Sequence, residues 1–460
     1  MKDTDYRNLS FWHESAPGSL DPRPPLASDE QVDVAIVGAG FSGLWTAYYL
    51  SELQPGIRIA LVEAEIAGFG ASGRNGGFAA GVLVGIDTLF DDPSLCDGAI
   101  RLQRAMFDSV DEIGRVCEHE GIDCHFAKGG SITVATVEVH RGRLRADLES
   151  LRALGFGEDD YRWLEPEECA ARVRTSPNLG GLFLRHCAAI HPLRLARGLA
   201  ERVESRGVKI YERSPARALE PRCVVTPGGR LRADVVVRAT EAYTKGIPGH
   251  ERALIPVHSM MIATEPLPES AWKEMGLANR EGVSDPRRYV IYGQRTADDR
   301  LAFGTRGNYF YGSRIFDRFS ADDPNFAIVQ RNAEALFPVL RDFRTTHRWG
   351  GSMGISRNWQ PKVGIDRAAG FAWIGGYAGT GVAASNLAGR TLAELIVERD
   401  SERTALPLVG PPFPNWEPEP MRWIGVTGVK KIGASLDRAE LSGRPTPKLR
   451  NKLYKAFVLK

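Results

Sequence analysis

The sequence predicts an α/β fold in which a domain with a parallel sheet carries an inserted domain with a mixed β-sheet. Three observations predict it. A strand, a glycine-rich turn, a helix and a second strand follow one another near the N-terminus, a second glycine-rich turn joins a strand to a helix near residue 380, and alternating strands lie between them. A chain of 460 residues has room for two or three domains.

The first of these units begins with an apolar, β-branched strand at 34–37 and continues into a helix over 42–53. Gly38, Gly40 and Gly43 between them form a G-x-G-x-x-G pattern. The first glycine permits a tight turn, the second lets the backbone approach a pyrophosphate, and the third lets helix and strand pack closely. The helix N-terminus then offers free N–H groups to the phosphates. The unit predicts a Rossmann-like dinucleotide-binding domain.

Glu63 supports this interpretation. It ends a second apolar strand, 57–62, and stands 20 residues beyond Gly43, where a carboxylate binds the ribose in dinucleotide folds. One alternative is a glycine-rich turn in another kind of α/β protein. The other is a transmembrane helix over the uncharged stretch 34–50, but a span needs about 20 apolar residues without such a turn.

Composition restricts the function further. A net charge of +2, with 43% hydrophobic and 25% charged residues, is ordinary for a soluble globular protein and indicates no nucleic-acid partner. The six cysteines include no C-x-x-C pair, and the histidines show no metal-ligand spacing, so no metal is expected. The N-terminus has no apolar signal segment. We therefore expect a cytoplasmic protein without a transmembrane segment.

The loop Gly68–Gly77, with the sequence GFGASGRNGG, follows the first unit directly. Its small residues allow a flat ligand to approach, and Arg74 and Asn75 are candidates for binding phosphate or ring carbonyls. With this loop, the run from Asp33 to Gly77 resembles the FAD-dependent amine and amino-acid oxidases of the D-amino-acid oxidase (glycine oxidase) superfamily. Within that superfamily it is most similar to γ-glutamylputrescine oxidase-like enzymes.

The resemblance implies FAD, a glutathione-reductase-type FAD fold, and an inserted substrate domain. It also implies that the turn after the strand 371–374 meets the flavin pyrimidine, where negative charge develops on reduction. The cofactor contacts expected by position are Gly38, Gly40, Phe41, Ser42, Gly43, Glu63, Ala64, Gly70, Ala71, Ser72, Arg74, Asn75, Gly76, Gly77, Ala216, Ala239, Thr240, Tyr243, Gly376, Tyr377, Gly379, Thr380, Gly381 and Val382.

The substrate is expected over the flavin, against strands near 254–265, 288–294 and 300–306 whose aromatic side chains can box an amine. The alternative is that most of these aromatic residues belong to the core or to an interface. The candidate catalytic residues are Tyr292, Arg306, His258, Trp349 and Thr380.

Three departures from the resembling family affect the chemistry. No cysteine stands in the stretch 350–356, where relatives with covalent flavin have one, so FAD is expected to be non-covalent. Ala302 stands at the approximate position of the oxygen-activating lysine of sarcosine oxidase-type relatives. Many relatives also have histidine at the position of Thr380.

The expected domains are discontinuous. They comprise an N-terminal arm at 1–30, a cofactor domain at 31–86, 187–254 and 345–400, a substrate domain at 87–186 and 255–344, and a C-terminal extension at 401–460. The extension is basic, with ten Lys/Arg and two Asp/Glu from Met421 onwards. It is predicted either to pack on the enzyme or to dock on a membrane surface, a partner or a second copy.

The sequence therefore favours oxidation of a small-molecule amine by FAD, with O2 as the final acceptor and H2O2 as product. The alternatives are a flavin dehydrogenase with another acceptor, a flavin monooxygenase, and a non-catalytic FAD-binding protein. No second, clearly separate G-x-G-x-x-G unit of strand, turn and helix is seen for the NAD(P)H that a monooxygenase would need.

Overall fold

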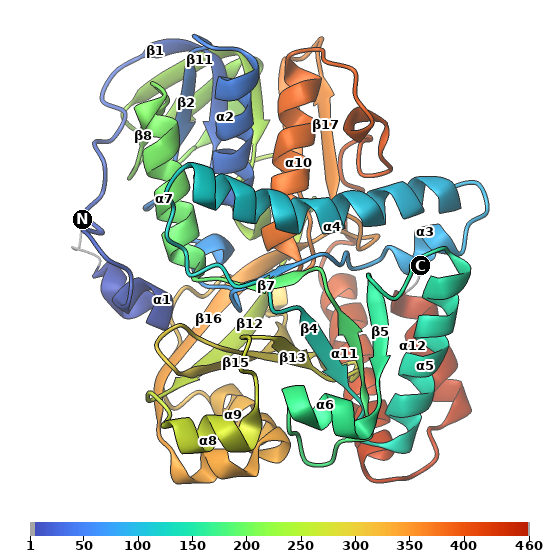
Figure 1. Ribbon diagram of the computed structural model, residues 1–460. Helices are drawn as coiled ribbons and strands as arrows, with labels where there is room; N and C mark the ends of the chain where they lie inside the picture. The colour runs from blue at the N-terminus through green and yellow to red at the C-terminus, as the bar shows by residue number, and fades with distance from the viewer. Residues whose placement is uncertain (1–4, 459–460) are drawn as a thin grey trace.

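The protein has two large β-sheets, one above the other in Figure 1, with helices on their outer sides. The structure is a computed structural model that describes residues 5–458, apart from the side chains of Arg306 and 455–458.

The upper sheet is built on β1 (Glu30–Val37), which pairs in parallel with β2 (Ile59–Val62) and with β11 (Gly229–Arg238). The strand order continues outward to β8 (Lys209–Tyr211) on one side and to β18 (Phe371–Gly375) and β17 (Lys362–Asp366) on the other. The short strands β9 (Ala218–Glu220) and β10 (Cys223–Thr226) extend from β11.

Helices cover this sheet because their apolar faces pack into one core with its strands. The four long ones are α2 (Phe41–Leu53), α4 (Cys96–His119), α7 (Pro192–Ser205) and α10 (Gly381–Ile396). The parallel strands β8, β2, β1, β11 and β18 of this sheet, with the helices α2 and α10, confirm the predicted Rossmann-like domain.

The lower sheet is mixed and has the order β16-β12-β15-β14-β13-β4-β6-β5. Its strands are β16 (Thr345–Ile355), β12 (Ile255–Thr264), β15 (Leu301–Asn308), β14 (Ile291–Arg295), β13 (Gly282–Ser284), β4 (Ser131–Val134), β6 (Gly181–Leu184) and β5 (Tyr161–Leu164). The helices around it are α5 (Glu138–Ala153), α6 (Pro166–Arg172), α8 (Glu269–Met275) and α9 (Pro324–Leu336). A separate pair, β3 (Phe78–Ala80) and β7 (Cys187–Ala189), lies between the two sheets.

Two segments lie elsewhere than the expected domain division put them. Residues 345–355 were expected in the cofactor domain, but β16 pairs along its length with β12 in the lower sheet. Helix α4 falls in the segment 87–186 that was assigned to the substrate domain, but its stripe of Met106, Val110 and Ile113 packs into the core of the upper domain. A helix joins the domain that its apolar stripe faces, and sequence order does not decide which one that is.

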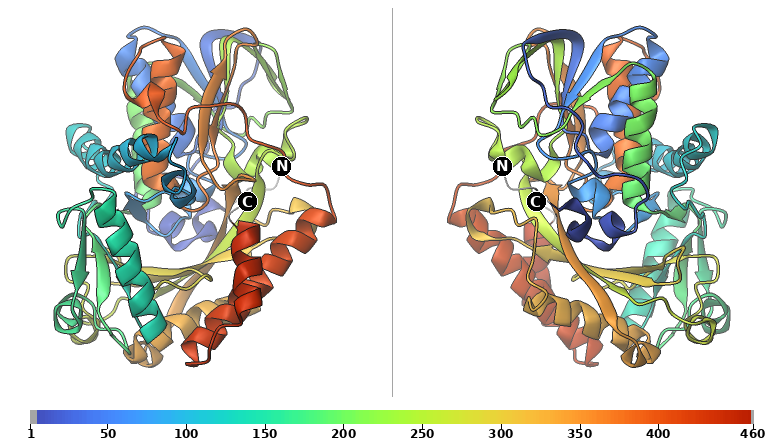
Figure 2. Two further views of the ribbon diagram at one scale, coloured as in Figure 1. Left: turned by 90° about the vertical axis from the view of Figure 1, so that its right-hand side faces the viewer. Right: turned by 90° about the vertical axis from the view of Figure 1, so that its left-hand side faces the viewer.

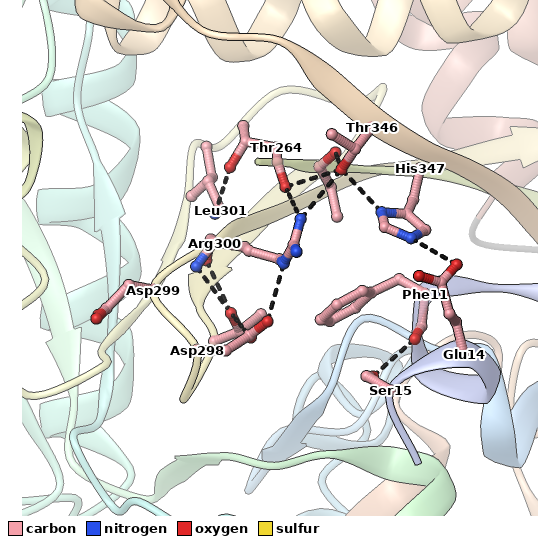
Figure 3. Close-up of polar contacts among 12 residues, drawn as sticks. Phe11, Glu14, Ser15, Thr264, Asp298, Asp299, Arg300, Leu301, Thr346 and His347 are labelled. Atoms are coloured by element: carbon pink, nitrogen blue, oxygen red, sulfur yellow. Dashed lines mark hydrogen bonds and ion pairs between the residues drawn. The ribbon is translucent and has the colours of Figure 1, made fainter. Parts of the chain in front are cut away.

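The N-terminal arm includes a short helix, α1 (Phe11–Glu14). Phe11 and Trp12 are buried in a cluster with Trp349. Figure 3 shows how the arm reaches the lower sheet: the Glu14 carboxylate lies 2.9 Å from Nε2 of His347. Phe11 and Trp12 therefore anchor the arm in the folded protein.

The C-terminal extension ends in two helices, α11 (Met421–Leu441) and α12 (Lys448–Val458), drawn in red in Figure 2. They lie against each other and against the substrate domain. Within residues 5–458, none of the helices combines the length and apolar character that crossing a membrane requires.

Candidate flavin and substrate site

A cavity lies between the two sheets. Its walls come from the start of α2, the loop 71–78, the 3₁₀ turn η3 (Glu241–Gly246), the strands β12, β14 and β16, and the start of α10. The predicted cofactor residues that line it are Phe41, Ser42, Ala71, Ser72, Arg74, Asn75, Gly76, Tyr377, Gly379, Gly381 and Val382. Other lining residues are Phe78, Glu241, Ser259, Tyr292, Gly351, Met353, Ala378 and Ser385.

The turn between β1 and α2 is closed by backbone. Gly38 has a φ of +106°, and a Cβ there would lie 2.6 Å from the carbonyl oxygen of Ala239. A Cβ on Gly43 would lie 2.0 Å from the carbonyl oxygen of Gly38. The Phe41 amide donates to Oγ of Ser72 at 2.8 Å, while the next amides of the first helical turn have no intrahelical partner. This arrangement suits a pyrophosphate, as the spacing predicts.

Glu63 lies beside that turn and accepts two backbone hydrogen bonds. Its Oε2 accepts from the Ala39 amide at 2.9 Å, and its Oε1 accepts from the Glu65 amide at 3.0 Å. Burial raises the pKa of this carboxyl to about 7. The Ser214 amide donates to the Glu63 carbonyl at 2.7 Å, which brings the segment before Ala216 to the same place. A carboxylate at this position can accept from the ribose hydroxyls of a dinucleotide.

The loop after Glu63 is held by its own polar groups. The Arg74 guanidinium is fully buried and donates to Tyr243 OH at 2.7 Å and to Asp317 Oδ1 at 3.0 Å. Tyr243 OH also donates to Asp317 Oδ1 at 2.5 Å. Asn75 donates to the carbonyl of Ala71 at 3.1 Å. Arg74 and Asn75 thus donate their hydrogen bonds to groups within the protein. This geometry favours a role in stabilising the loop rather than in binding phosphate.

Two tryptophans fasten this loop from outside. Nε1 of Trp349 donates to the Arg74 carbonyl at 3.0 Å, and Nε1 of Trp12 donates to the Asn75 carbonyl at 2.8 Å. Trp349, a candidate catalytic residue, is therefore placed behind the loop and does not line the cavity. Trp12 was not among the predicted site residues, because an arm far away in sequence gives no sign of which loop it supports.

The second glycine-rich turn, between β18 and α10, is faced by Glu241. Its Oε1 accepts from the Gly376 amide at 2.7 Å and from the Tyr377 amide at 3.3 Å, and its Oε2 accepts from the Gly354 amide at 2.8 Å. Glu241 has a φ of +42°, and burial raises its pKa to about 7. The sequence prediction missed it, although a polar residue after the carboxyl end of a parallel strand is a usual signal of a site.

The same turn meets the first one. Tyr377 OH and Ser42 Oγ are 2.8 Å apart, so the two glycine-rich turns share one hydrogen bond. Thr380 Oγ1 donates to the Tyr377 carbonyl at 3.1 Å and caps the turn locally, and Thr380 does not line the cavity. The amides at the start of α10 lack intrahelical partners and can face a delocalised negative charge.

The lower sheet closes the cavity with Tyr292 and Ser259, whose hydroxyl groups are hydrogen-bonded to each other. The Tyr292 ring also packs edge-on against Phe78, with the ring centres 6.1 Å apart. Among the candidate catalytic residues, Tyr292 lies in the cavity wall. Arg306 is on β15, but its side chain lies outside the described part of the structure.

His258, another catalytic candidate, has both ring nitrogens bonded to the backbone. Nδ1 lies 3.2 Å from the Asn308 carbonyl, and Nε2 accepts from the Phe316 amide at 2.9 Å. Burial lowers its pKa to about 4, so the ring is neutral near pH 7. It is fully buried outside the cavity lining, and this environment favours a structural role.

Comparisons with known proteins agree with this geometry. A family model described as FAD dependent oxidoreductase (DAO) matches residues 33–395. The chain is 31% identical to a probable oxidoreductase OrdL of Haemophilus influenzae over 83% of this chain and 86% of that protein. It is 29% identical to the gamma-glutamylputrescine oxidoreductase of Escherichia coli over 86% of this chain and 90% of that enzyme.

Solved structures show the same fold. The glycine oxidase of Geobacillus kaustophilus superposes with a TM-score of 0.66 at 21% identity, covering 81% of this chain and 96% of that one. The L-proline dehydrogenase of P. horikoshii superposes with a TM-score of 0.67 at 18% identity, covering 83% of this chain and 96% of that one.

Proposed function

The chain belongs to the family of FAD-dependent oxidoreductases, and we propose that within this family it oxidises a small amine at the carbon beside nitrogen. The family, the FAD cofactor and the two-sheet fold expected from the sequence are confirmed by the family match and by the superposed structures. The choice of an amine is our inference. It draws support from the relative that is named a gamma-glutamylputrescine oxidoreductase.

FAD, when bound, accepts a hydride from the substrate and passes the electrons to an acceptor. The residues present fit this group. The turn at Gly38–Gly43 and the Glu63 carboxylate suit the pyrophosphate and the ribose. The cavity between the loop 71–78 and the start of α10 suits the flavin ring.

One observation carries the proposal: the cavity lined by the two glycine-rich turns is closed by Tyr292, Ser259 and Met353 of the substrate sheet. A small substrate held there lies between the flavin position and a wall in which the described side chains are Met353 and the hydroxyl-bearing Tyr292 and Ser259. Such a wall favours the neutral amine, which needs no desolvation of an ammonium charge. A substrate that binds as the neutral amine needs no strong base in the wall, and after oxidation the imine product hydrolyses in water.

The test is an anaerobic panel of amines, N-substituted amino acids and acylated diamines, followed through the flavin absorbance of the purified protein. An amine should bleach the flavin, and the resulting carbonyl product should be detectable. If only 2-hydroxy acids or NAD(P)H bleach it, the proposal is wrong. The Tyr292→Phe variant should lower kcat/KM by about tenfold, and Tyr289→Phe, outside the cavity lining, is the matched control.

A second candidate differs in the electron acceptor. Ala302, at the position expected for an oxygen-activating lysine, is fully buried on β15 and offers no charge to O2. This favours a dehydrogenase that passes electrons to a quinone or a protein. Anaerobically bleached enzyme should then regain its colour faster with a soluble quinone than with air. Faster recovery in air would establish the oxidase.

We further propose that FAD is held without a covalent bond. The strand β16 and the residues that line the cavity include no cysteine among the described residues. Acid precipitation should leave the yellow colour in the supernatant. A yellow pellet would contradict the proposal.

A further inference from the structure

Helices α11 and α12 of the C-terminal extension lie beyond residue 395, where the family match ends. Ten large apolar side chains are exposed in the described part of the chain, and six of them fall between residues 421 and 453. These six are Met421, Trp423, Ile424, Leu441, Leu449 and Leu453. An exposed apolar concentration of this kind marks an interaction surface.

The charges of the two helices are divided between their inner and outer sides. The acidic residues Asp437 and Glu440 are 6% and 3% exposed, and both face inward to pair with Arg288 at 3.1 and 2.8 Å. The exposed ionic side chains of residues 421–454 are all basic, namely Lys431, Arg438, Arg444, Lys448, Arg450 and Lys452. The outer surface of the helix pair is therefore positive.

Helix α12 combines both properties along its length. On its inner side Tyr454 packs against Gly433, and the exposed Arg450 reaches across to donate to Ser435 Oγ at 2.6 Å. Leu449 and Leu453 are one helical turn apart, as are Lys448 and Lys452. Adjacent positions differ by about 100° around a helix, so a leucine stripe and a lysine stripe lie side by side away from α11.

We propose that this surface of α11 and α12, with the leucine stripe of α12 at its centre, docks on an anionic phospholipid bilayer. A helix with Leu and Trp on one side and Lys or Arg beside them lies in the interface of a membrane, and its cations are attracted to anionic headgroups. Nucleic acid would use the cations but not the exposed leucines. Figure 2 shows both helices at the outer edge of the molecule, where a bilayer can reach them.

The experiment is co-sedimentation of the FAD-loaded full chain with vesicles, followed by flavin absorbance in the pellet. The protein should pellet with vesicles of phosphatidylglycerol and phosphatidylcholine, less with phosphatidylcholine alone, and less at high salt because screening weakens the attraction. The double variant Leu449→Glu/Leu453→Glu should lower binding at least about tenfold.

The matched control is Val139→Glu/Ile328→Glu, which places the same charges at exposed apolar positions of α5 and α9. It should bind within about twofold of the parent protein, since neither position is on the basic surface. The variant Lys448→Glu/Lys452→Glu should lose the preference for anionic vesicles. Equal loss in the control, or no binding of the parent protein to anionic vesicles at low salt, overturns the proposal. A dimer that the leucine variant dissociates would assign the surface to a second copy instead.

Discussion

The two glycine-rich turns of the upper domain are built alike. Each follows a strand of the parallel sheet and precedes a helix, at β1–α2 and at β18–α10. Each is faced by a glutamate that comes just after the neighbouring parallel strand, Glu63 after β2 and Glu241 after β11. Both carboxylates accept backbone N–H groups from their turn, and burial raises the pKa of both to about 7.

The difference lies in how each turn is held. Glu63 and its partner Ala39 are 24 residues apart, but Glu241 and Gly376 are 135 apart. The first turn is also closed on itself, since a Cβ on Gly43 would meet backbone at 2.0 Å, whereas a Cβ on Gly381 would meet only the Tyr377 ring at 3.2 Å. The nucleotide end thus depends on one local segment, while the flavin end depends on distant segments meeting correctly.

The largest expected effect comes from adding a single methyl group to a glycine in each of the two turns and comparing the losses of FAD affinity. Gly43→Ala should weaken the free energy of FAD binding by about 3 kcal/mol, because the backbone cannot move aside for the Cβ. This corresponds to a loss of more than about a hundredfold in FAD affinity. Gly381→Ala should weaken the free energy of FAD binding by less than about 1.5 kcal/mol, because the Tyr377 side chain can shift away from the new Cβ. FAD titration of the two apoproteins measures this. Gly142→Ala on α5, where the Cβ would meet nothing within 4 Å, is the control. Equal losses at Gly43 and Gly381 would remove the contrast.

The next effect tests whether Glu241 holds the flavin end together. Glu241→Ala leaves the amides of Gly354, Gly376 and Tyr377 without their acceptor, which should cost about 2–3 kcal/mol in the free energy of unfolding. Glu241→Gln retains an acceptor oxygen and should lose less. Urea unfolding of the apoproteins measures both. A Glu241→Ala apoprotein as stable as its parent would show that these hydrogen bonds do not hold the turn.

Glu63→Ala should act on FAD affinity more than on stability. A charged acceptor for the ribose is worth about 2 kcal/mol, so the Kd for FAD should rise about thirtyfold. FMN lacks the adenosine ribose, so its weaker binding should be unchanged in this variant, which provides the control. An unchanged Kd for FAD would mean that Glu63 serves only the Ala39 and Glu65 amides.

The smallest effect is a pH dependence that both glutamates share. Their folded-state pKa of about 7 lies above the ordinary value of 4.5, so the folded apoprotein holds protons that the unfolded chain has lost. Stability is therefore full below about pH 4.5 and falls as the pH rises towards 7, by about 1 kcal/mol for each group between pH 6 and pH 7. Glu63→Gln and Glu241→Gln should each flatten the slope of the unfolding free energy against pH. Unchanged slopes in both variants would contradict the shared pKa shift.

The local patterns in the sequence predicted the nucleotide end well. The strand, the turn at Gly38–Gly43, helix α2 and Glu63 occupy one run of the chain, so their spacing is set by the geometry of a single β-α-β unit. The loop 68–77 likewise indicated FAD, which the family match confirms. The alternation of the strands β12, β14 and β15 predicted their existence and Tyr292 among their residues.

Only the tertiary structure decided what each distant side chain contacts. A one-residue difference in strand register moves a side chain to the opposite face of its sheet, so the sequence could not separate Tyr292 in the cavity wall from His258 in the core. Trp349 and Arg74 proved to hold the loop 70–77, and Glu241 and Trp12 were found only where folding brought their partners. By itself the sequence determined the fold and the cofactor, because both depend on patterns of residues that lie close together in the chain. Packing between segments far apart in the chain determined the walls of the site.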